Sequence, residues 1–486
     1  MKSILASVLA LLLFAVPARA QTVTIALGAE PVGLDPQLHQ DGAERNVGRN
    51  IFETLLAREP DGTLVPGLAA ALPEQIDPLT WRFRLRPNIR FHNGEAFNAQ
   101  AVATSVKRIV APAFASRQRP FLTTIVDARV VDDLTVDIIT NGPDPSLPTR
   151  MYWLTIVPAS VTPEINARPI GTGPFRFVSW NRGQSIVLER NADYWRDNTN
   201  IRELRFRFVP EAGTRLAGLR AGDFDLILNL QPEDAPRAPQ TVSIPSVEVS
   251  QVSINADLGM TQDIRVRQAL NYAIDKQAII DQVFGGFATL LQGQMLADNW
   301  LGHNPDLRPW PYDPARARSL LREAGVAGRS IDLVASNGRW LKDRELAEVV
   351  ASFWEAAGLR VNLRVVPWPE YLDNMQNRRV ARPAAIIGNP SNQLFDADRS
   401  LTAFFHTVSG QAGIADAALS AAIERARHEV DAPARLALYH AITRDVNERA
   451  LQVWLVRNND IYGLSRRLVW QPRADGLILA REMRVR

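Results

Sequence analysis

PIGTGPFRFVSWNRGQSIVLERNADYW, residues 169–195, is the most informative stretch of this chain. Gly171 and Gly173 are followed by Pro174, so we expect a turn in which glycine supplies φ freedom and proline then fixes φ. Apolar residues alternate with polar ones on both sides of the Asn181 to Gly183 segment. The stretch therefore predicts a turn that leads into a β-hairpin.

Outward from this hairpin, short strands dominate the first half of the chain, and helices become frequent after about residue 257. Apolar residues at helical spacing predict helices over residues 99–110, 264–284, 314–324 and 345–357, and a helical pair over 417–450 that breaks around 431–433. Asn98 and Asp313 are candidate N-caps, and Gly325 is a candidate C-terminal stop. A strand over residues 361–365 follows a helix, and this order favours an α/β arrangement in the second half.

The hairpin segment closely resembles the GTGPF…L.RN..YW signature of the family-5 extracellular solute-binding proteins. These are the oligopeptide, dipeptide and nickel receptors of ABC importers. Other motifs that resemble this family occur in the family's order along the chain: Leu34-Asp35-Pro36, Gly62 to Leu68, Trp81 to Gly94, Arg265 to Asp275 and Tyr312 to Gly325. Only the segments that would face a ligand depart noticeably.

The resemblance implies an α/β fold of the periplasmic-binding-protein-like type II, with two lobes joined by a two-strand hinge and an extra β-rich subdomain, as in cluster C. We expect the crossover segments near Val252 to Ala256 and Leu451 to Arg457. The implied organisation is a signal peptide at residues 1–20, lobe I at 21–45, 170–255 and 456–486, the extra subdomain at 46–169, and lobe II at 256–455.

The first twenty residues predict a cleavable export signal. Lys2 is followed by an apolar run over residues 4–16 and by the A-x-A site Ala18-Arg19-Ala20. The run is shorter than the roughly 17–25 residues that span a bilayer. We therefore expect a mature chain from Gln21. Because the chain has no cysteine, the lipid attachment of many relatives is ruled out, and we expect a periplasmic protein without a lipid anchor.

Composition narrows the possible chemistry. The absence of cysteine excludes disulfides, thiolate zinc sites and cysteine nucleophiles. The six histidines show no metal-ligating spacing, so we expect no cofactor and no metal. The G-x-S-x-G, S-x-x-K, Walker A and G-x-G-x-x-G motifs are absent. We expect a binding protein and not an enzyme, and a secreted hydrolase is the alternative of another class.

Charge argues against a nucleic-acid partner. Removal of residues 1–20 takes away Lys2 and Arg19 and no acidic residue, so the formal net charge falls from +3 to +1. Arginines are interspersed with acidic residues along predicted helices, which is typical of solvated helix faces. A protein that follows a phosphate backbone would instead present a basic stripe with aromatic residues.

Three segments are candidates for ligand contacts, because a closing receptor needs aromatic walls, backbone edges and a few charged anchors. In peptide-binding relatives, the backbone that matches the first segment pairs with the ligand as an added strand. The candidate residues are Glu30, Val32 and Gly33 in the first segment, Arg339 and Trp340 in the second, and Trp368, Asn389, Asn392, Asp396 and Arg399 in the third.

The third segment departs from the family in one respect. Peptide receptors commonly place an Asp a few residues before an Asp-Pro or Glu-Pro pair, where it holds the amino group of the peptide. This chain has Asn389 at that place, and Asp396 is followed by Ala397. An asparagine carries no charge, and charge-assisted hydrogen bonds are about twice as strong as neutral ones. Asp396 is then the nearest carboxylate left to hold an amine.

The sequence thus predicts a monomeric periplasmic substrate-binding component of an ABC importer. It would capture a short peptide by lobe closure and deliver it to a membrane permease. A non-peptide polar metabolite, such as an opine, a sugar conjugate or a metal chelate, is the alternative ligand, because Asn389 replaces the usual acid.

Overall fold

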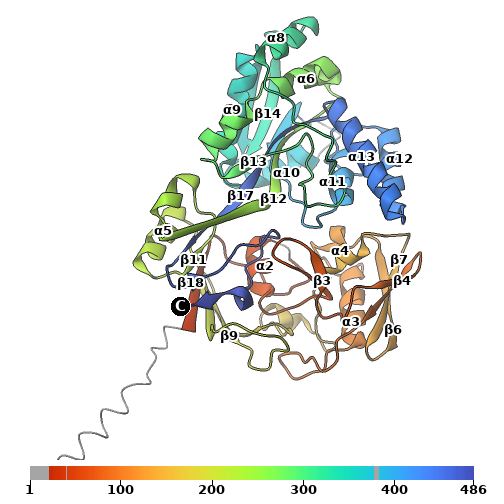
Figure 1. Ribbon diagram of the computed structural model, residues 1–486, viewed down its shortest axis with the longest axis vertical. Coiled ribbons are helices and arrows are strands. Elements are labelled where there is room, and N and C mark those ends of the chain that lie inside the picture. Colours follow the sequence, from red (N-terminus) through yellow and green to blue (C-terminus); the bar gives the residue numbers. More distant parts are fainter. Residues whose placement is uncertain (1–20, 40, 377–382) are drawn as a thin grey trace, which may run out of the picture.

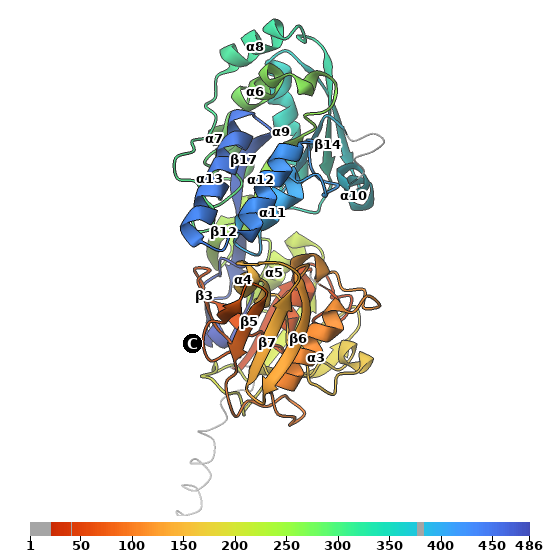
Figure 2. The same ribbon diagram turned by 90° about the vertical axis from the view of Figure 1, so that its right-hand side faces the viewer.

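The computed structural model describes residues 21–39, 41–376 and 383–486. The predicted signal peptide therefore lies outside the described residues. The chain forms two lobes, one above the other in Figure 1. In Figure 2, β12 (Gln240–Ile254) and β17 (Gln452–Leu464) run from one lobe into the other.

Most of the longer helices lie after residue 260. The α-helices of the described residues are α2 (Gly42–Gly48), α3 (Ala99–Val110), α4 (Leu147–Met151), α5 (Ala212–Ala221), α6 (Ile264–Tyr272), α7 (Lys276–Ala278), α8 (Pro314–Glu323), α9 (Asp343–Ala356), α10 (Trp368–Gln376), α11 (Ala397–Phe405), α12 (Ala417–His428) and α13 (Ala432–Glu448).

The strands are mostly short. They are β1 (Thr22–Leu27), β2 (Leu56–Arg58), β3 (Leu64–Pro66), β4 (Glu74–Asp77), β5 (Thr80–Arg84), β6 (Ile125–Asp132), β7 (Thr135–Thr140), β8 (Phe175–Asn181), β9 (Ser185–Arg190), β10 (Glu203–Phe208), β11 (Leu226–Ile227), β13 (Ala288–Leu290), β14 (Ser330–Ser336), β15 (Arg360–Val366), β16 (Ala385–Gly388), β18 (Leu468–Val469) and β19 (Arg484–Val485).

The largest sheet continues through both lobes in the order β15-β14-β16-β12-β17-β11-β1-β10-β9-β8, with β13 paired to β17. We call β1 to β11, α2 to α5, β18 and β19 the first lobe, and β13 to β16 with α6 to α13 the second lobe. β12 and β17 belong to both. Each lobe has a buried core of its own, around Phe206 and Leu204 in the first and around Trp354 and Leu333 in the second.

Within the first lobe, β4 to β7 form a separate antiparallel sheet in the order β4-β5-β7-β6. Helix α3 lies along this sheet (Figure 2) and buries Val102 and Val106 against Phe83 and Val136. This unit, which we call the inserted subdomain, follows β1 and precedes β8 in the chain. Leu394 of the second lobe packs into the same apolar cluster, so the subdomain contacts the opposite lobe.

The two connecting strands are irregular where they pass between the lobes. They pair regularly as far as Pro245 opposite Asn459 and resume at Val249 opposite Arg457. The Arg457 Nε donates to the Ser246 carbonyl at 2.7 Å and so occupies a backbone acceptor that the ladder leaves open. This break lies before the crossover expected at residues 252–256, because Gln251 to Ile254 already pair with β16 of the second lobe.

Local signals predicted several elements correctly. The Asn98 side chain accepts the Ala101 N–H at 3.1 Å at the start of α3. Asp313 accepts the Arg316 N–H at 2.8 Å at the start of α8, and Gly325 follows that helix with a φ of 68°. The predicted hairpin is β8 and β9, which turn through Gly183 with a φ of 72°.

Two expectations need correction. Gly171 and Gly173 do not have left-handed φ angles; a Cβ at Gly171 would instead lie 2.0 Å from the Ile51 carbonyl oxygen. Close backbone approach is therefore the reason for these glycines. The helix expected over residues 264–284 ends at Tyr272, and Asp275 caps a new start by accepting the Ala278 N–H at 2.9 Å.

Candidate functional site

The two lobes touch along both ends of the cleft between them. At one end, Lys342 of the second lobe forms an ion pair with Glu233 of the first lobe at 2.9 Å. At the other end, Arg58 of the first lobe donates to the Leu394 carbonyl of the second lobe at 2.8 Å. The structure therefore presents the lobes in a closed arrangement, with groups from both lobes facing each other.

The Glu30 to Gly33 loop lies in the first lobe, and its polar groups are partly occupied. The Glu30 carboxylate accepts the Trp180 Nε1–H at 2.8 Å and the Gly183 N–H at 3.1 Å, so this side chain fixes the β8–β9 turn. The exposed Val32 donates its N–H to the Glu44 carboxylate at 2.8 Å. Of the three predicted residues, Gly33 lines a cavity of about 30 Å³ that is described below.

The loop before α9 is folded around one carboxylate. Asp343 accepts the N–H groups of Gly338 at 3.0 Å, Arg339 at 2.9 Å and Trp340 at 3.2 Å. Three backbone donors on one carboxylate leave the loop little freedom. The Arg339 side chain is exposed, and its guanidinium lies 5.6 Å from the Trp340 ring centroid and 5.3 Å from that of Trp368.

Trp340, Trp368 and Tyr371 form an aromatic cluster on the second lobe. Trp368 and Tyr371 are stacked with centroids 5.3 Å apart, and Trp340 meets both rings edge-on at 5.4 and 5.5 Å. A Cβ at Gly388 would lie 2.2 Å from the Tyr371 hydroxyl, so the cluster rests directly on β16. The structure thus brings the predicted residues Arg339, Trp340 and Trp368 together.

Two carboxylates that sequence reasoning missed lie on the connecting strands next to this cluster. Burial raises the pKa of Glu248 to about 7; the Arg339 charge and a hydrogen bond from Trp340 oppose this shift, whereas Asp460 adds to it. Burial likewise raises the pKa of Asp460 to about 6. Glu248 belongs to the irregular part of β12, and such bulges re-aim side chains beside functional sites.

Asn389 and Asn392 are both buried, but they differ in their partners. The Asn392 Nδ2 donates to the Asp396 carbonyl at 2.9 Å and to the Ser400 Oγ at 2.8 Å, so Asn392 holds the start of α11. The Asn389 Nδ2 and the Asn392 Oδ1 are both buried without a hydrogen-bond partner among the described residues. Asn392 thus has a structural role through its Nδ2, and each of the two amides keeps one group without a partner.

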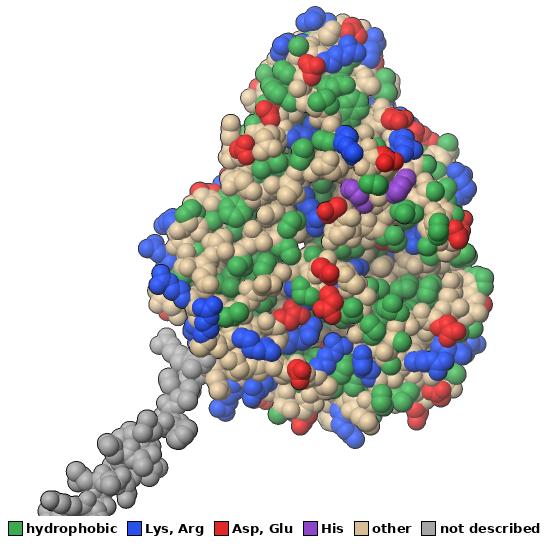
Figure 3. Space-filling view, viewed as in Figure 1, with side chains coloured by type: hydrophobic (Ala, Val, Ile, Leu, Met, Phe, Trp, Pro, Cys, Tyr) green, Lys and Arg blue, Asp and Glu red, His purple; other side chains and the backbone are tan. Residues whose placement is uncertain are grey.

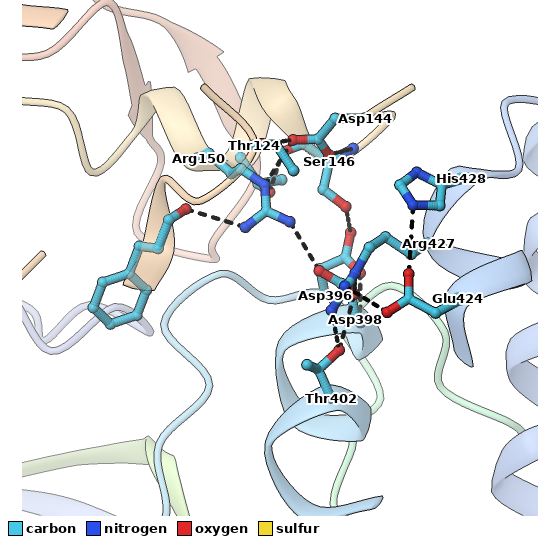
Figure 4. A network of polar contacts seen from close by, with 12 residues as sticks. Thr124, Asp144, Ser146, Arg150, Asp396, Asp398, Thr402, Glu424, Arg427 and His428 are labelled. Carbon is cyan, nitrogen blue, oxygen red and sulfur yellow. Dashed lines mark hydrogen bonds and ion pairs between the residues drawn. The ribbon is translucent and has the colours of Figure 1, made fainter. Parts of the chain in front are cut away.

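Asp396 does not fit the expected role of amine anchor. Its side chain is fully buried and accepts hydrogen bonds from Arg435 Nη2 at 2.8 Å and from Ser146 Oγ at 3.0 Å. It also caps α11 by accepting the Asp398 N–H at 2.9 Å. Figure 4 shows Asp396 facing Ser146 of the opposite lobe. The carboxylate is already used by the protein itself, which local sequence could not reveal.

Asp398 lies at the centre of a second set of ion pairs in Figure 4. It accepts Arg150 Nη2 and Arg427 Nε, both at 2.8 Å. Burial opposes ionisation here, but the two guanidinium charges hold the pKa of Asp398 below its usual range. Arg150 belongs to α4 and also binds Asp144 at 2.8 Å. We call Ser146, Arg150, Asp396 and Asp398 the closure network, because it joins α4 of the first lobe to the second lobe.

Arg399, the next residue along the chain, differs from Asp398 in that it lacks an ion pair among the described residues. Its guanidinium lies 4.3 Å from the Phe121 ring centroid across the cleft, and the described residues give it no hydrogen bond or ion pair. Burial and the charge of Arg150 lower the pKa of Arg399 to about 10. Phe121 stacks on Trp153 at 4.4 Å, and the Arg45 guanidinium lies 4.5 Å from the Trp153 centroid.

Beside this stack is the cavity of about 30 Å³ that Gly33 lines. Four side chains on its walls carry buried polar atoms without a partner among the described residues: Glu44 Oε2, Arg45 Nε, Gln118 Oε1 and Trp153 Nε1. Buried polar atoms in folded proteins nearly always have partners. Donors and acceptors of both kinds thus face a space large enough for a few small groups.

Sequence reasoning missed Arg45, Phe121, Trp153, Glu248 and Asp460. Only Glu248 has a local signal, because it is the sole charged residue in the apolar and small-residue run PSVEVSQVS. Arg45, Phe121 and Trp153 act through contacts between segments more than 30 residues apart, which periodicity does not encode.

The described residues contain no group of three or more His, Cys, Asp or Glu that could hold a metal ion. Among the same residues, no helix has both the length and the apolar composition to cross a membrane. On the face drawn in Figure 3, basic and acidic side chains are interspersed over both lobes.

Comparisons with known proteins give a consistent result. The chain is 33% identical over 318 residues to the glutathione-binding protein GsiB of Pectobacterium atrosepticum, a match that covers 63% of this chain and 62% of that protein. It is 28% identical over 398 residues to the dipeptide-binding protein of Escherichia coli, with 73% of each chain covered.

Among solved structures, NikA from Brucella suis in complex with Fe(III)-EDTA is similar with a TM-score of 0.86 and 23% identity, and the match covers 96% of this chain and all of that one. This likeness confirms the predicted mixed α/β fold of periplasmic binding proteins. Residues 63–412 match the family described as "Bacterial extracellular solute-binding proteins, family 5 Middle". The chain belongs to family 5 of the bacterial extracellular solute-binding proteins.

Proposed function

We propose that this chain is the receptor of an ABC importer and that it captures a short peptide, or a solute with the same charged ends, between its two lobes. The observation that carries the proposal is the presence, between the lobes, of charged groups that have no ion pair among the described residues. These are a cation, Arg399, which lies on the Phe121 ring, and an anion, Glu248, which accepts a hydrogen bond from Trp340 and lies near the Arg339 charge.

The cationic end would hold a carboxylate. Arg399 lies on an aromatic ring, and its Nε is buried without a hydrogen-bond partner among the described residues; a buried guanidinium without an ion pair is costly. A carboxylate from the solute would supply that charge in a bidentate geometry. Arg45 and the cavity beside Trp153 provide further donors for the same end of the solute.

The anionic end would hold an amine. Glu248 takes the place of the missing acid at position 389, and the Asn389 amide lies in the loop whose Ser391 pairs with Glu248. The aromatic cluster provides a wall for the body of the solute. A solute with an ammonium at Glu248 and a carboxylate at Arg399 would satisfy both charges.

The names of the relatives agree with such chemistry. Glutathione and dipeptides, named for two of them, both carry an amine and a carboxylate. A non-peptide polar metabolite is the second candidate, favoured by the uncharged Asn389. Structures of lower identity with agropinic acid and with Fe(III)-EDTA illustrate that class.

Titration calorimetry with L-alanyl tripeptide and glutathione, each compared with its N-acetyl and C-amide derivatives, tests the proposal. Arg399→Gln should weaken binding of the free-carboxylate form about tenfold to a hundredfold and leave the C-amide nearly unchanged. The matched control is Arg425→Gln, which removes an exposed arginine of α12. Equal losses for both forms would contradict the carboxylate assignment.

A failure of all peptides to bind would favour the second candidate, which native mass spectrometry of gently purified protein would then identify by mass. Cleavage products in the same incubations would support the secreted hydrolase and overturn the proposal.

Lobe closure by a bound solute should appear as compaction in small-angle scattering. Export with removal of residues 1–20 is tested by N-terminal sequencing, which should read from Gln21.

A further inference from the structure

A second polar cavity, of about 50 Å³, lies inside the first lobe. It is enclosed by the end of α2 and the residues that follow it, by the segment from Tyr194 to Arg196, and by the C-terminal segment from Arg473 to Arg481. It shares Arg49 with the cavity beside Trp153, but Arg399, Glu248 and the aromatic cluster of the second lobe do not line it. The proposed capture of a solute therefore makes no use of its other arginines.

Arginines dominate the walls of this cavity. Among the described residues, five arginines line it, namely Arg49, Arg58, Arg196, Arg473 and Arg481, and Glu53 is the only carboxylate on its walls. Asp475 and Glu482 lie behind the walls: Asp475 accepts Arg473 at 2.8 Å, and Glu482 accepts both Arg473 and Arg481 at 2.8 Å. Five cations against three anions leave a local charge of +2.

The excess charge belongs to three arginines with only neutral partners. Arg49 donates to the Thr54 hydroxyl at 3.0 Å and to the Tyr152 carbonyl. Arg58 donates to the carbonyls of Gly62 at 2.6 Å and Leu394 at 2.8 Å. Arg196 donates to the carbonyls of Pro66 at 3.2 Å and Gly67 at 3.1 Å. Burial lowers the pKa of each of the three.

Glu53 does not neutralise them by direct contact. Its carboxylate accepts the Thr172 hydroxyl at 2.8 Å, the Tyr194 hydroxyl at 2.9 Å and the Trp195 Nε1–H at 2.9 Å. Burial raises the pKa of Glu53, and the three hydrogen bonds oppose this shift. Arg58 gives an independent sign of a missing partner: it is 5% exposed, and its Nε is buried without a hydrogen bond.

The size of the cavity fits a small ligand. A buried water needs about 10–15 Å³ by this measure, so the cavity has room for a few waters or for one compact oxyanion. Guanidinium groups bind tetrahedral oxyanions through paired N–H donors.

We propose that this arginine-lined cavity binds a small tetrahedral oxyanion of about two negative charges, of the inorganic phosphate or sulfate class. Its charge would match the surplus of the walls. Because Arg58 also holds the Leu394 carbonyl and lies 4.3 Å from the Phe395 ring of the second lobe, a bound anion would order one of the contacts between the lobes.

Thermal unfolding in increasing inorganic phosphate and, separately, sulfate tests this site, with ionic strength held constant by sodium chloride. A ligand that binds only the folded state raises the melting temperature in a saturable way. Arg196→Gln should shift the midpoint of that saturation by at least about tenfold. Arg196 is half-buried and should tolerate the change, whereas Arg425→Gln is the matched exposed control and should behave as the wild type.

A melting temperature that responds to phosphate and sulfate no more than to chloride overturns the proposal. So does an equal response of the Arg196→Gln variant, because the anion would then bind elsewhere. Crystals soaked in selenate give a second readout: the expected anomalous peak lies within hydrogen-bond reach of Arg49, Arg58 and Arg196, and its absence at saturating selenate contradicts the site. Neither readout depends on the solute of the cleft.

Discussion

The closure network and the open groups of the cleft lie side by side, yet they treat charge in opposite ways. In the network, Asp396 and Asp398 each meet an arginine at 2.8 Å and further donors around them. One residue later, the Arg399 guanidinium lies on the Phe121 ring and has no ion pair among the described residues. Satisfied groups hold the lobes and the helix start in place, whereas unsatisfied groups await a partner. Whether a polar side chain already has a protein partner therefore distinguishes structural residues from ligand-binding candidates better than residue type does.

The largest effect should come from the network. Arg150→Met removes a buried guanidinium and leaves Asp144 and Asp398 without it, so we expect the unfolding free energy to fall by about 3–5 kcal/mol. Urea denaturation measures this loss. Arg344→Gln, which breaks the exposed Arg344–Glu348 pair at 2.9 Å, is the control and should cost at most about 0.5 kcal/mol. Similar losses in both variants would remove the distinction between buried and exposed pairs.

Glu248 should give the next effect, through pH. Its pKa is raised from 4.5 to about 7, so the folded state holds a proton that the unfolded state releases between these values. The unfolding free energy of the solute-free protein should therefore fall by up to about 3 kcal/mol as the pH rises from 4.5 to 7.

Glu248→Gln should flatten that part of the stability curve. Asp460→Asn is the comparison variant, and its effect should lie at lower pH, because the pKa of Asp460 is raised to about 6. Affinity for an amine should show the reverse trend and increase as the pH rises through 7. An unchanged curve in Glu248→Gln would mean that this carboxylate is not buried as described.

Asp396→Asn should affect the fold and not the solute. The variant keeps the shape of the helix cap but loses the charge that faces Arg435, so we expect a stability loss of about 1.5–3 kcal/mol. Affinity per folded molecule, measured by calorimetry, should stay within about twofold because the carboxylate faces the protein. Loss of amine-bearing ligands alone, with normal stability, would restore the role first expected for Asp396.

The smallest effect concerns the aromatic cluster. Trp368→Ala removes the ring stacked on Tyr371, and we expect solute affinity to fall by about 0.5–1.5 kcal/mol. Trp368→Phe keeps a flat face and should recover most of the affinity in the same calorimetric titration. If both variants bind as the wild type does, the cluster serves packing alone and the cleft wall must lie elsewhere.

Much of the fold was predictable because its signals are local. Asn98 and Asp313 cap helices through donors three residues ahead, and the β8–β9 hairpin follows from alternation around Gly183. Family resemblance supplied the arrangement of lobes, which no local pattern contains. The glycines at 171 and 173 were noticed for the wrong reason, since the Ile51 backbone that excludes a side chain lies 120 residues away in the sequence.

The site was predictable in part. Arg339, Trp340 and Trp368 do come together, because a loop and a helix of the same lobe carry them. Glu30, Asn392 and Asp396 bind other parts of the protein, and this depends on distant partners such as Trp180 and Arg435. The charge of Arg399 made it a candidate, but its contact with Phe121 joins the two lobes and has no local signal in the sequence.

The irregular pairing of β12 and β17 has a mechanical consequence. Pro245 has no N–H to offer the neighbouring strand, and Ser246, Val247 and Glu248 lie opposite the single residue Asn458. β13 pairs with Asn458 and Arg457 on the other side of β17, but torsion between β12 and β17 at this gap breaks no ladder bond between these two strands. The lobes should thus swing about one fixed axis, with Glu248 at the pivot, where atoms move least. A solute bound near Glu248 would keep its contacts there while the lobe edges far from the pivot separate. Release would therefore begin at the Arg399 end of the solute.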